Sequence, residues 1–130
     1  MAVWGIGATW DGRDVSKEFV GYRTAAIGYN EDEKPTFHKR MRDVKVGDLI
    51  FIKAKHNESG WLYVKAIGIV MDIHLCAENG FEGQDGIKVR WIKNLTDNPV
   101  KISSPPEYGS THTLYEEKQD SVIQSVVNLL

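Results

Sequence analysis

The feature that most constrains the fold is a pair of apolar runs within residues 44–70, separated by a short polar loop. The first run, residues 49–54, follows Gly47-Asp48, a dipeptide typical of turns, and is apolar almost throughout, as a buried strand is. The second run covers residues 61–70, and the polar residues 57–60 lie between the two. Two short apolar runs joined in this way predict a β-hairpin.

The hairpin is expected to have one apolar face and one mixed face, because side chains alternate along a strand. The expected apolar face consists of Ile50, Ile52 and Ala54 with Leu62, Val64 and Ala66. The expected mixed face consists of Phe51, Lys53 and Lys55 with Trp61, Tyr63 and Lys65. Rings beside ammonium groups are typical of a sheet that meets a flat or anionic ligand. Lysine stems that cover apolar surface give the same pattern, so both interpretations stay open.

Shorter elements are predicted around this hairpin. Strands are indicated at residues 2–9, 23–29, 87–93 and 100–102, and glycines at positions 5 and 7 mark a bulge or a close approach. Apolar residues at helical spacing predict helices over residues 37–44 and about 117–129. Trp10–Asp14 is expected to be a turn, and Ser16 starts a segment through Val20 that we expect to be loop rather than helix.

Length and composition favour a single domain spanning residues 1–130, large enough to bury a core without disulfides. The only cysteine, Cys76, cannot form an internal disulfide and is expected to be a small buried side chain. No apolar run approaches the roughly 18 residues of a membrane span, and no signal-peptide pattern opens the chain. We therefore expect a cytoplasmic protein with no membrane partner. The fold class predicted is α+β, with a small curled mixed sheet or pseudo-barrel, short helices and a C-terminal helix.

Charge is distributed unevenly along the chain, although the formal net charge is only −2. Residues 38–65 carry seven basic and three acidic side chains, a net +4, whereas the segments before and after carry −2 and −4. If the chain binds nucleic acid, the residues of this basic third expected to contact its backbone are Lys39, Arg40, Arg42 and Lys55. The alternative for the cluster at 39–42 is a solvated helix face.

Several common catalytic patterns are missing from the sequence. Gly5-Ile6-Gly7 lacks the third glycine of a dinucleotide fingerprint, and there is neither a phosphate-binding GxxxxGK[ST] run nor an HExxH motif. The four histidines lack the spacing of metal ligands, so we predict no metal and no cofactor. Carboxylate catalysis stays open, because Asp11, Asp48 and Asp72 adjoin predicted strand ends.

Aromatic residues are the remaining functional signal. Eight of them lie on or beside predicted strands, and most are expected to be core, as Trp91 is. Trp10 and Tyr29 follow glycine-containing strands, where a ring would line the mouth of a barrel. Bases are read in such mouths by stacking on rings and by hydrogen bonds to the base edge.

With these residues in view, the chain resembles the PUA-like superfamily, and within it the EVE domains and the related N-terminal modules of modification-dependent restriction enzymes. The resemblance covers nearly the whole chain, including the late strand with Trp91 and the terminal helix. Its motifs are Val3-Trp4-Gly5-Ile6-Gly7, Ala25-Ala26-Ile27-Gly28-Tyr29, the strand at 46–53 and Ala66-Ile67-Gly68-Ile69-Val70.

The resemblance implies a pseudo-barrel with a pocket at its mouth. In EVE and YTH domains that pocket takes a modified base flipped out of DNA or RNA, and in ASCH domains a similar cleft can be hydrolytic. The positions that correspond to the pocket wall are Trp4, Trp10, Tyr29, Phe51 and Lys53, and we add Trp61 from the mixed face to the predicted ligand-binding set.

The leading hypothesis is a non-enzymatic module that recognises a modified nucleobase in DNA or RNA through an aromatic pocket. One alternative is an ASCH-like hydrolase acting on a nucleoside or on RNA. A second is a stand-alone factor in bacterium–phage conflict, which would bind a small nucleotide ligand or an effector protein.

Overall fold

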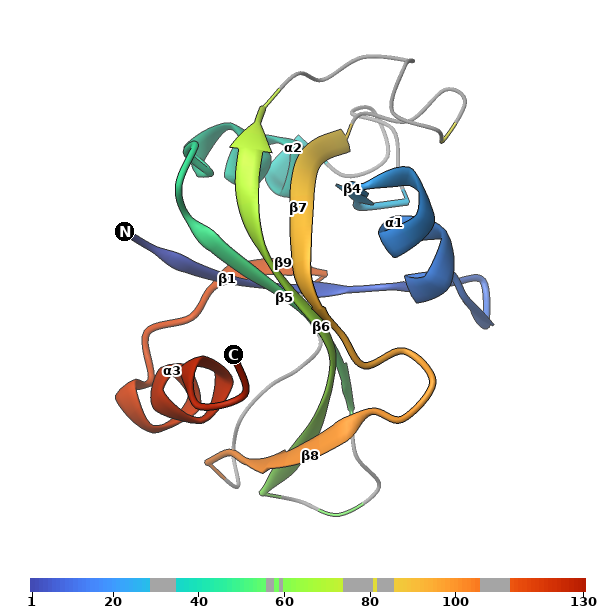
Figure 1. Cartoon of the computed structure of the whole chain (residues 1–130). Helices are drawn as coiled ribbons and strands as arrows, with labels where there is room; N and C mark the ends of the chain where they lie inside the picture. Colours follow the sequence, from blue (N-terminus) through green and yellow to red (C-terminus); the bar gives the residue numbers. More distant parts are fainter. Residues whose placement is uncertain (29–34, 56–57, 59, 74–80, 82–85, 106–112) are drawn as a thin grey trace.

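The computed structural model describes residues 1–28, 35–55, 58, 60–73, 81, 86–105 and 113–130. Within these ranges the chain is α+β: a mixed sheet curls into a half-barrel, and three short helices pack on it (Figure 1). The predicted fold class is confirmed at this level. No helix in the described ranges is long and apolar enough to cross a membrane.

The strands of the main sheet are β1 (Val3–Gly7), β4 (Thr24–Ala26), β5 (Leu49–Lys55), β6 (Trp61–Asp72), β7 (Gly86–Asn94), β8 (Val100–Ser103) and β9 (Leu114–Glu116). Their order in the sheet is β4-β7-β6-β5-β1-β9, and β8 also pairs with β6. β1 and β5 run parallel, and every other pairing is antiparallel. The predicted hairpin is β5–β6, at the centre of the sheet.

The N-terminal third contains a small hairpin and a helix. β2 (Thr9–Trp10) and β3 (Arg13–Asp14) are joined by Asp11 and Gly12, both at positive φ, as a two-residue hairpin turn requires. The predicted turn is therefore confirmed. α1 (Ser16–Tyr22) is a helix, so the expectation of a loop was wrong.

Two contacts account for this helix. Asp14 accepts hydrogen bonds from the backbone N–H and the hydroxyl of Ser16, which fix its first turn. Phe19 is fully buried in the core, and tertiary packing of this kind stabilises helices too short to persist alone.

The two predicted helices are present with shifted ends. α2 (Pro35–Asp43) begins at a proline, a residue suited to the first helical position, and α3 (Asp120–Val127) is the C-terminal helix. The strand β9 was not predicted. It lies alongside β1, and its three residues are too few for a periodic pattern to reveal.

Both faces of the central strands are buried, in two separate cores. Trp4, Ile50 and Ile52 belong to the first core, together with Phe19 of α1 and Met41 of α2. The second core contains residues from the same strands and is closed by α3 through two fully buried valines; its main members are Val3, Leu49, Phe51, Leu62, Val64, Ile67, Ile102, Val122 and Val126. α1 and α2 thus pack on one face of the sheet and α3 on the other (Figure 1).

A β-bulge explains why the expected division of the hairpin into two faces was wrong. Ile52 pairs with Ala66 but Lys53 pairs with Val64, so Lys65 is an extra residue in β6. Beyond the bulge the side chains of β6 change faces: Ala66 lies in the first core and Val64 in the second. Lys65 forms an ion pair with Asp14, with Nζ 2.8 Å from Oδ2.

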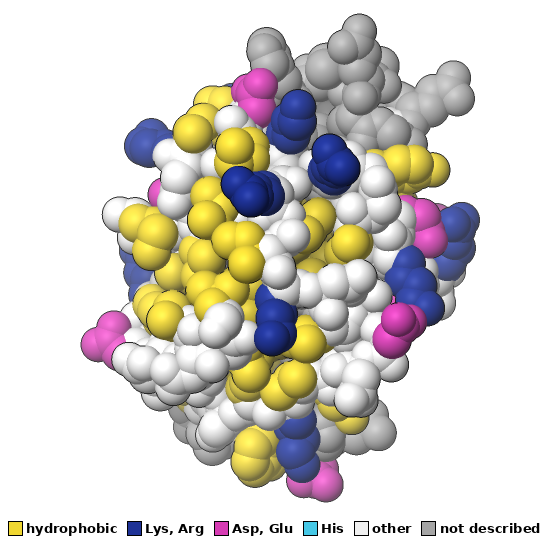
Figure 2. Space-filling view, in the orientation of Figure 1, with side chains coloured by type: hydrophobic (Ala, Val, Ile, Leu, Met, Phe, Trp, Pro, Cys, Tyr) yellow, Lys and Arg dark blue, Asp and Glu magenta, His cyan; other side chains and the backbone are white. Residues whose placement is uncertain are grey.

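Not all of the sheet surface is covered by helices. Met71 of β6 and Ile92 of β7 are exposed. On the side of the molecule where β6 and β7 face the viewer, hydrophobic side chains lie at the surface among several lysines and arginines (Figure 2).

Candidate functional site

Asp48 joins the start of β5 to the start of β1. Its carboxylate accepts hydrogen bonds from Trp4 Nε1 at 3.0 Å, from the Ala2 amide at 3.0 Å and from the Lys45 amide at 2.9 Å. Burial acts to raise the pKa of Asp48, but these hydrogen bonds together hold that pKa below its usual value. Asp48 is therefore a structural carboxylate, and the indole of Trp4, only 4% exposed, is fixed by it within the first core.

Lys53 lies near the end of β5, opposite Gly7 of β1, and is only 6% exposed. Burial lowers the pKa of Lys53 to about 8, because a desolvated ammonium is less stable than a neutral amine. Its Nζ lies 5.6 Å from the centre of the Tyr115 ring, over the ring face. An ammonium and an aromatic ring are thus held side by side.

Gly5 determines where the Tyr115 ring lies. A Cβ atom at position 5 would overlap Cζ and Oη of Tyr115, so only glycine leaves room for the ring against β1. The sequence predicted a bulge or a close approach at this glycine, and the close approach is confirmed. Burial raises the pKa of the Tyr115 hydroxyl, which keeps it protonated at neutral pH.

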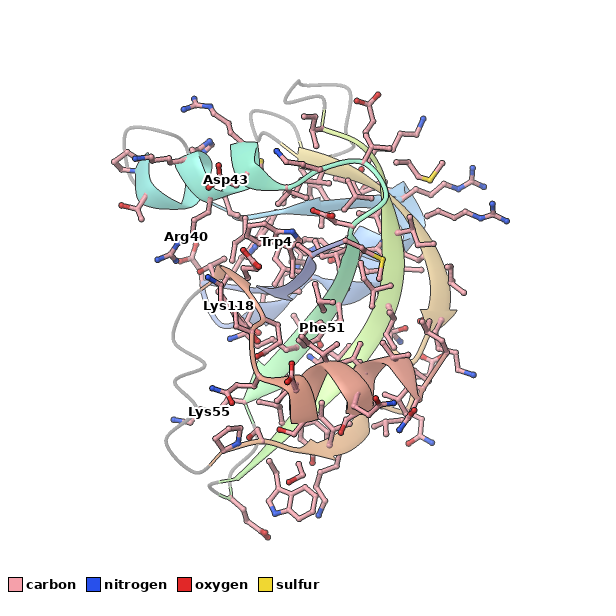
Figure 3. All side chains as sticks on the ribbon, turned by 90° about the vertical axis from the view of Figure 1, so that its left-hand side faces the viewer. Trp4, Arg40, Asp43, Phe51, Lys55 and Lys118 are labelled. Carbon is pink, nitrogen blue, oxygen red and sulfur yellow. The ribbon has the colours of Figure 1, made fainter. Side chains whose placement is uncertain are left out.

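Three basic side chains, the flanking cations, are near this pair along the chain or through a hydrogen bond: Lys55 follows Lys53 by two positions, Lys118 follows Tyr115 by three, and Arg40 donates to the carbonyl of the residue before Tyr115. Figure 3 shows Arg40 of α2, Lys118 of the segment between β9 and α3, and Lys55 of β5 one below the other along one side of the molecule. Lys55 and Lys118 are exposed, and Arg40 is half-buried with Nη1 donating to the Leu114 carbonyl at 3.1 Å. Lys39 and Arg42, also predicted as backbone contacts, are exposed on α2.

One acidic residue lies in the same region. Glu117 precedes Lys118 and is nearly buried, and its Oε1 accepts the Gln119 amide at 2.9 Å, just ahead of α3. Burial raises the pKa of Glu117, and the hydrogen bonds from the Gln119 and Lys118 amides only partly offset this. Through this hydrogen bond, Glu117 holds the backbone immediately before the first residue of α3.

Trp10 does not stand beside Lys53. Its half-buried ring packs against the first core, with its centre 5.7 Å from that of Phe19 and 5.0 Å from that of Phe81. It covers Gly28 so closely that a Cβ there would lie 2.6 Å from Trp10 Nε1. The space over Gly28 is thus filled by the ring of Trp10, and Tyr29, the other residue expected at the mouth of a barrel, lies outside the described residues.

The remaining predicted ligand-binding residues are also separated. Phe51 is fully buried in the second core, so its ring has no exposed face in this structure. Trp61 is 37% exposed at the start of β6, with Lys101 Nζ 4.6 Å from the centre of one of its rings. Of the predicted set, Lys53 has its ammonium over the Tyr115 ring, while Trp4 and Phe51 support the sheet from within.

Sequence reasoning missed Tyr115 and Lys118. Gly5 signalled that something approaches β1, but nothing in the sequence said which residue. Tyr115 belongs to the short strand β9, and it reaches Gly5 only through pairing across more than one hundred positions of the chain.

Comparison with protein-family models gives no match for this chain, and comparison with curated proteins gives none either. Function must therefore be inferred from the geometry of the site.

Proposed function

We propose that this protein is a non-enzymatic module that binds a modified nucleobase in DNA or RNA, built on a fold of the PUA-like, EVE-like kind. The observation that carries the proposal is the Lys53–Tyr115 pair, with the ammonium 5.6 Å from the ring centre. The Tyr115 ring is only half-buried, so part of it is open to a base, and the Lys53 ammonium is a hydrogen-bond donor for carbonyl or ring-nitrogen acceptors on the base edge.

The unfavourable burial of Lys53 supports this assignment. A lysine that is 6% exposed, with its pKa lowered to about 8 by desolvation, reduces the stability of the folded chain. Strongly perturbed groups of this kind cluster at functional sites, where their charge meets a ligand. A bound base that accepts a hydrogen bond from Nζ would replace part of the lost hydration.

The flanking cations supply contacts for a strand. Arg40, Lys55 and Lys118 follow one side of the molecule (Figure 3), where each can contact a phosphate of a strand bound at the Lys53–Tyr115 pair. In this arrangement the phosphates set the position of the strand, while the pair selects the base.

The test is binding of fluorescein-labelled 12-mers, single- and double-stranded, in DNA and RNA. Each carries one central 5-methylcytosine, 5-hydroxymethylcytosine or N6-methyladenine, or the unmodified base. We expect at least one modified 12-mer to bind roughly 5-fold or more tightly than its unmodified counterpart, the lower end of what one stacked base contributes. Lys53→Met should abolish that preference, and the exposed-lysine control Lys101→Met should keep it. Equal binding of all 12-mers, or a preference that survives Lys53→Met, would refute the proposal.

A hydrolase acting on a nucleoside or on RNA is the second candidate, and the lowered pKa of Lys53 favours it specifically. Lysines tuned to about 7–8 serve as general bases and nucleophiles. This candidate requires turnover of nucleosides or RNA oligonucleotides that rises with pH through about 8, the pKa of Lys53, and is lost in Lys53→Met. Asp48 is not expected to take part, because three donors already occupy its carboxylate.

A further inference from the structure

A second basic site lies on a different part of the molecule from Lys53. A surface cavity of about 480 Å³ opens between the C-terminal end of α1 and the strands β6 and β7. Its wall combines three cations with apolar side chains: Arg23, Lys88, Arg90, Val20, Met71 and Trp91. None of these residues belongs to the Lys53–Tyr115 pair or its flanking cations.

The three cations of this cavity are not matched by an acidic residue in the part of its wall that the structure describes. Among the residues that the structure describes, no carboxylate lines the cavity, and Arg23, Lys88 and Arg90 form no ion pair with any of them. Asp72 is the register partner of Lys88 on β6, but it is not among the lining residues. Three like charges around one cavity repel each other, and the attraction of each cation to a bound anion would offset that repulsion.

The backbone of Arg23 is held in an unfavourable conformation at this cavity. Arg23 follows α1 with φ 56° and ψ 42°, in the left-handed region where glycine is the usual residue. Its amide donates to the Val20 carbonyl at 3.2 Å, and its carbonyl accepts the Val89 amide at 2.8 Å, so the chain on both sides fixes it. Strain of this kind concentrates at functional sites.

The apolar part of the cavity wall consists mainly of a fixed Trp91 ring and a partly exposed Met71 side chain. Trp91 is fixed by its Nε1, which donates to the Phe19 carbonyl at 3.0 Å, and Met71 is 48% exposed. The volume falls within the roughly 300–1,000 Å³ of small-molecule sites, and inorganic phosphate alone would leave most of it empty. A phosphate ester the size of a nucleotide fits both the cations and the apolar wall.

We propose that this cavity binds the phosphate of a nucleotide-sized phosphate ester, with Arg23, Lys88 and Arg90 around the phosphate and the organic part against Trp91 and Met71. The ester is either a free nucleotide or one unit of a nucleic-acid strand, since both present the same phosphate chemistry. The proposal is independent of base recognition at Lys53, because the two sites share no residue.

The test is isothermal titration calorimetry of the full chain with AMP, with adenosine as the phosphate-free match, and with an unmodified single-stranded DNA 12-mer. We expect AMP to bind at least ten times more tightly than adenosine. Lys88→Gln should weaken AMP binding about tenfold, while Lys93→Gln, the same substitution at an exposed position of β7 outside the cavity, should leave it unchanged. Binding of the 12-mer but not AMP, again sensitive to Lys88→Gln only, would support the proposal and assign the phosphate to a strand.

Arg23→Gly provides a readout that does not depend on Lys88. Glycine adopts the left-handed conformation without strain, so this variant should unfold at an equal or higher temperature than the natural chain while binding AMP or the 12-mer at least fivefold more weakly. The proposal is overturned if AMP and the 12-mer bind no better than adenosine. It is also overturned if Lys88→Gln and Lys93→Gln have equal effects, or if Arg23→Gly retains full binding.

Discussion

Asp48 and Lys53 lie five positions apart around the same strand, and both are nearly buried charged groups with a lowered pKa. A lowered pKa means a stabilised charge for a carboxylate but a destabilised charge for an ammonium. Hydrogen bonds from Lys45, Ala2 and Trp4 outweigh burial at Asp48, so the fold stabilises its charge. At Lys53 burial itself lowers the pKa, so the fold destabilises its charge. The first residue holds the sheet together, and the second is kept despite a loss of stability.

The dependence of stability on pH differs in the same way. The contribution of Asp48 is complete above its unfolded pKa of 3.8 and is lost as pH falls through its lower folded pKa. For Lys53, the unfolded chain binds a proton up to 10.5 but the folded chain only to about 8. Unfolding therefore takes up a proton between these values, and stability rises with pH across that window. The whole difference corresponds to about 3 kcal/mol.

Replacing Asp48 is the largest expected loss. Asp48→Ala leaves three donors without their acceptor, each worth about 1–3 kcal/mol, so the free energy of unfolding in urea at pH 7 should fall by at least about 3 kcal/mol. Asp48→Asn keeps one acceptor oxygen and should lose less. If Asp48→Ala lowers the free energy of unfolding by less than about 1 kcal/mol, Asp48 does not have the structural role assigned to it.

Replacing Lys53 should have the opposite sign. Lys53→Met keeps a long apolar side chain without the buried charge, so the free energy of unfolding at pH 7 should rise by up to about 3 kcal/mol. The gain should vanish near pH 11, where the lysine is neutral in both states. Lys55→Met, an exposed change on the same strand, should stay within about 0.5 kcal/mol at either pH. Destabilisation by Lys53→Met at pH 7 would show that the fold favours the ammonium after all.

The position of Tyr115 can be tested through the glycine beneath it. Gly5→Ala forces the Tyr115 ring away from β1 and should lower the free energy of unfolding by about 1–3 kcal/mol, together with the preference for a modified base. Gly7→Ala is the matched control, because the nearest atom to a Cβ there is the Thr113 carbonyl oxygen at 4.0 Å. Similar losses of unfolding free energy in the two variants, measured in urea, would show that the position of the Tyr115 ring does not depend on Gly5.

The exposed pair of Trp61 and Lys101 should matter least. Its ammonium lies 4.6 Å from a ring centre, closer than in the Lys53–Tyr115 pair, but at the surface. Trp61→Ala should lower the free energy of unfolding by about 0.5–1 kcal/mol and leave the base preference unchanged. Loss of that preference would instead indicate that the base binds at the start of β6, beside Trp61.

The sequence predicted the parts of the fold that follow from periodicity. The β5–β6 hairpin, the alternation in β7 and the C-terminal helix all carry a regular apolar pattern. The bulge after Ile52 could not be predicted, because one extra residue changes the faces of a strand without altering its composition. For that reason Val64 and Ala66 were placed on the same face.

The site was less predictable than the fold. Lys53 was identified from the family resemblance, but its neighbour Tyr115 comes from a short strand without a sequence signal. The cavity beside β7 was missed because Lys88 and Arg90 look like the solvent side of an amphipathic strand. Arg23 also stands after α1 where a glycine would have indicated a left-handed residue.

The most direct test of the central claim is the pKa of Lys53 in the free protein, measured by NMR on lysine labelled with ¹³C at Cε. The signal of Lys53 is assigned by its disappearance in Lys53→Met. We expect it to titrate at about 8, as its burial requires. Titration at 10.5, the ordinary value for lysine, would show that the ammonium is not desolvated and would contradict the assignment of Lys53 as a charge kept for a ligand.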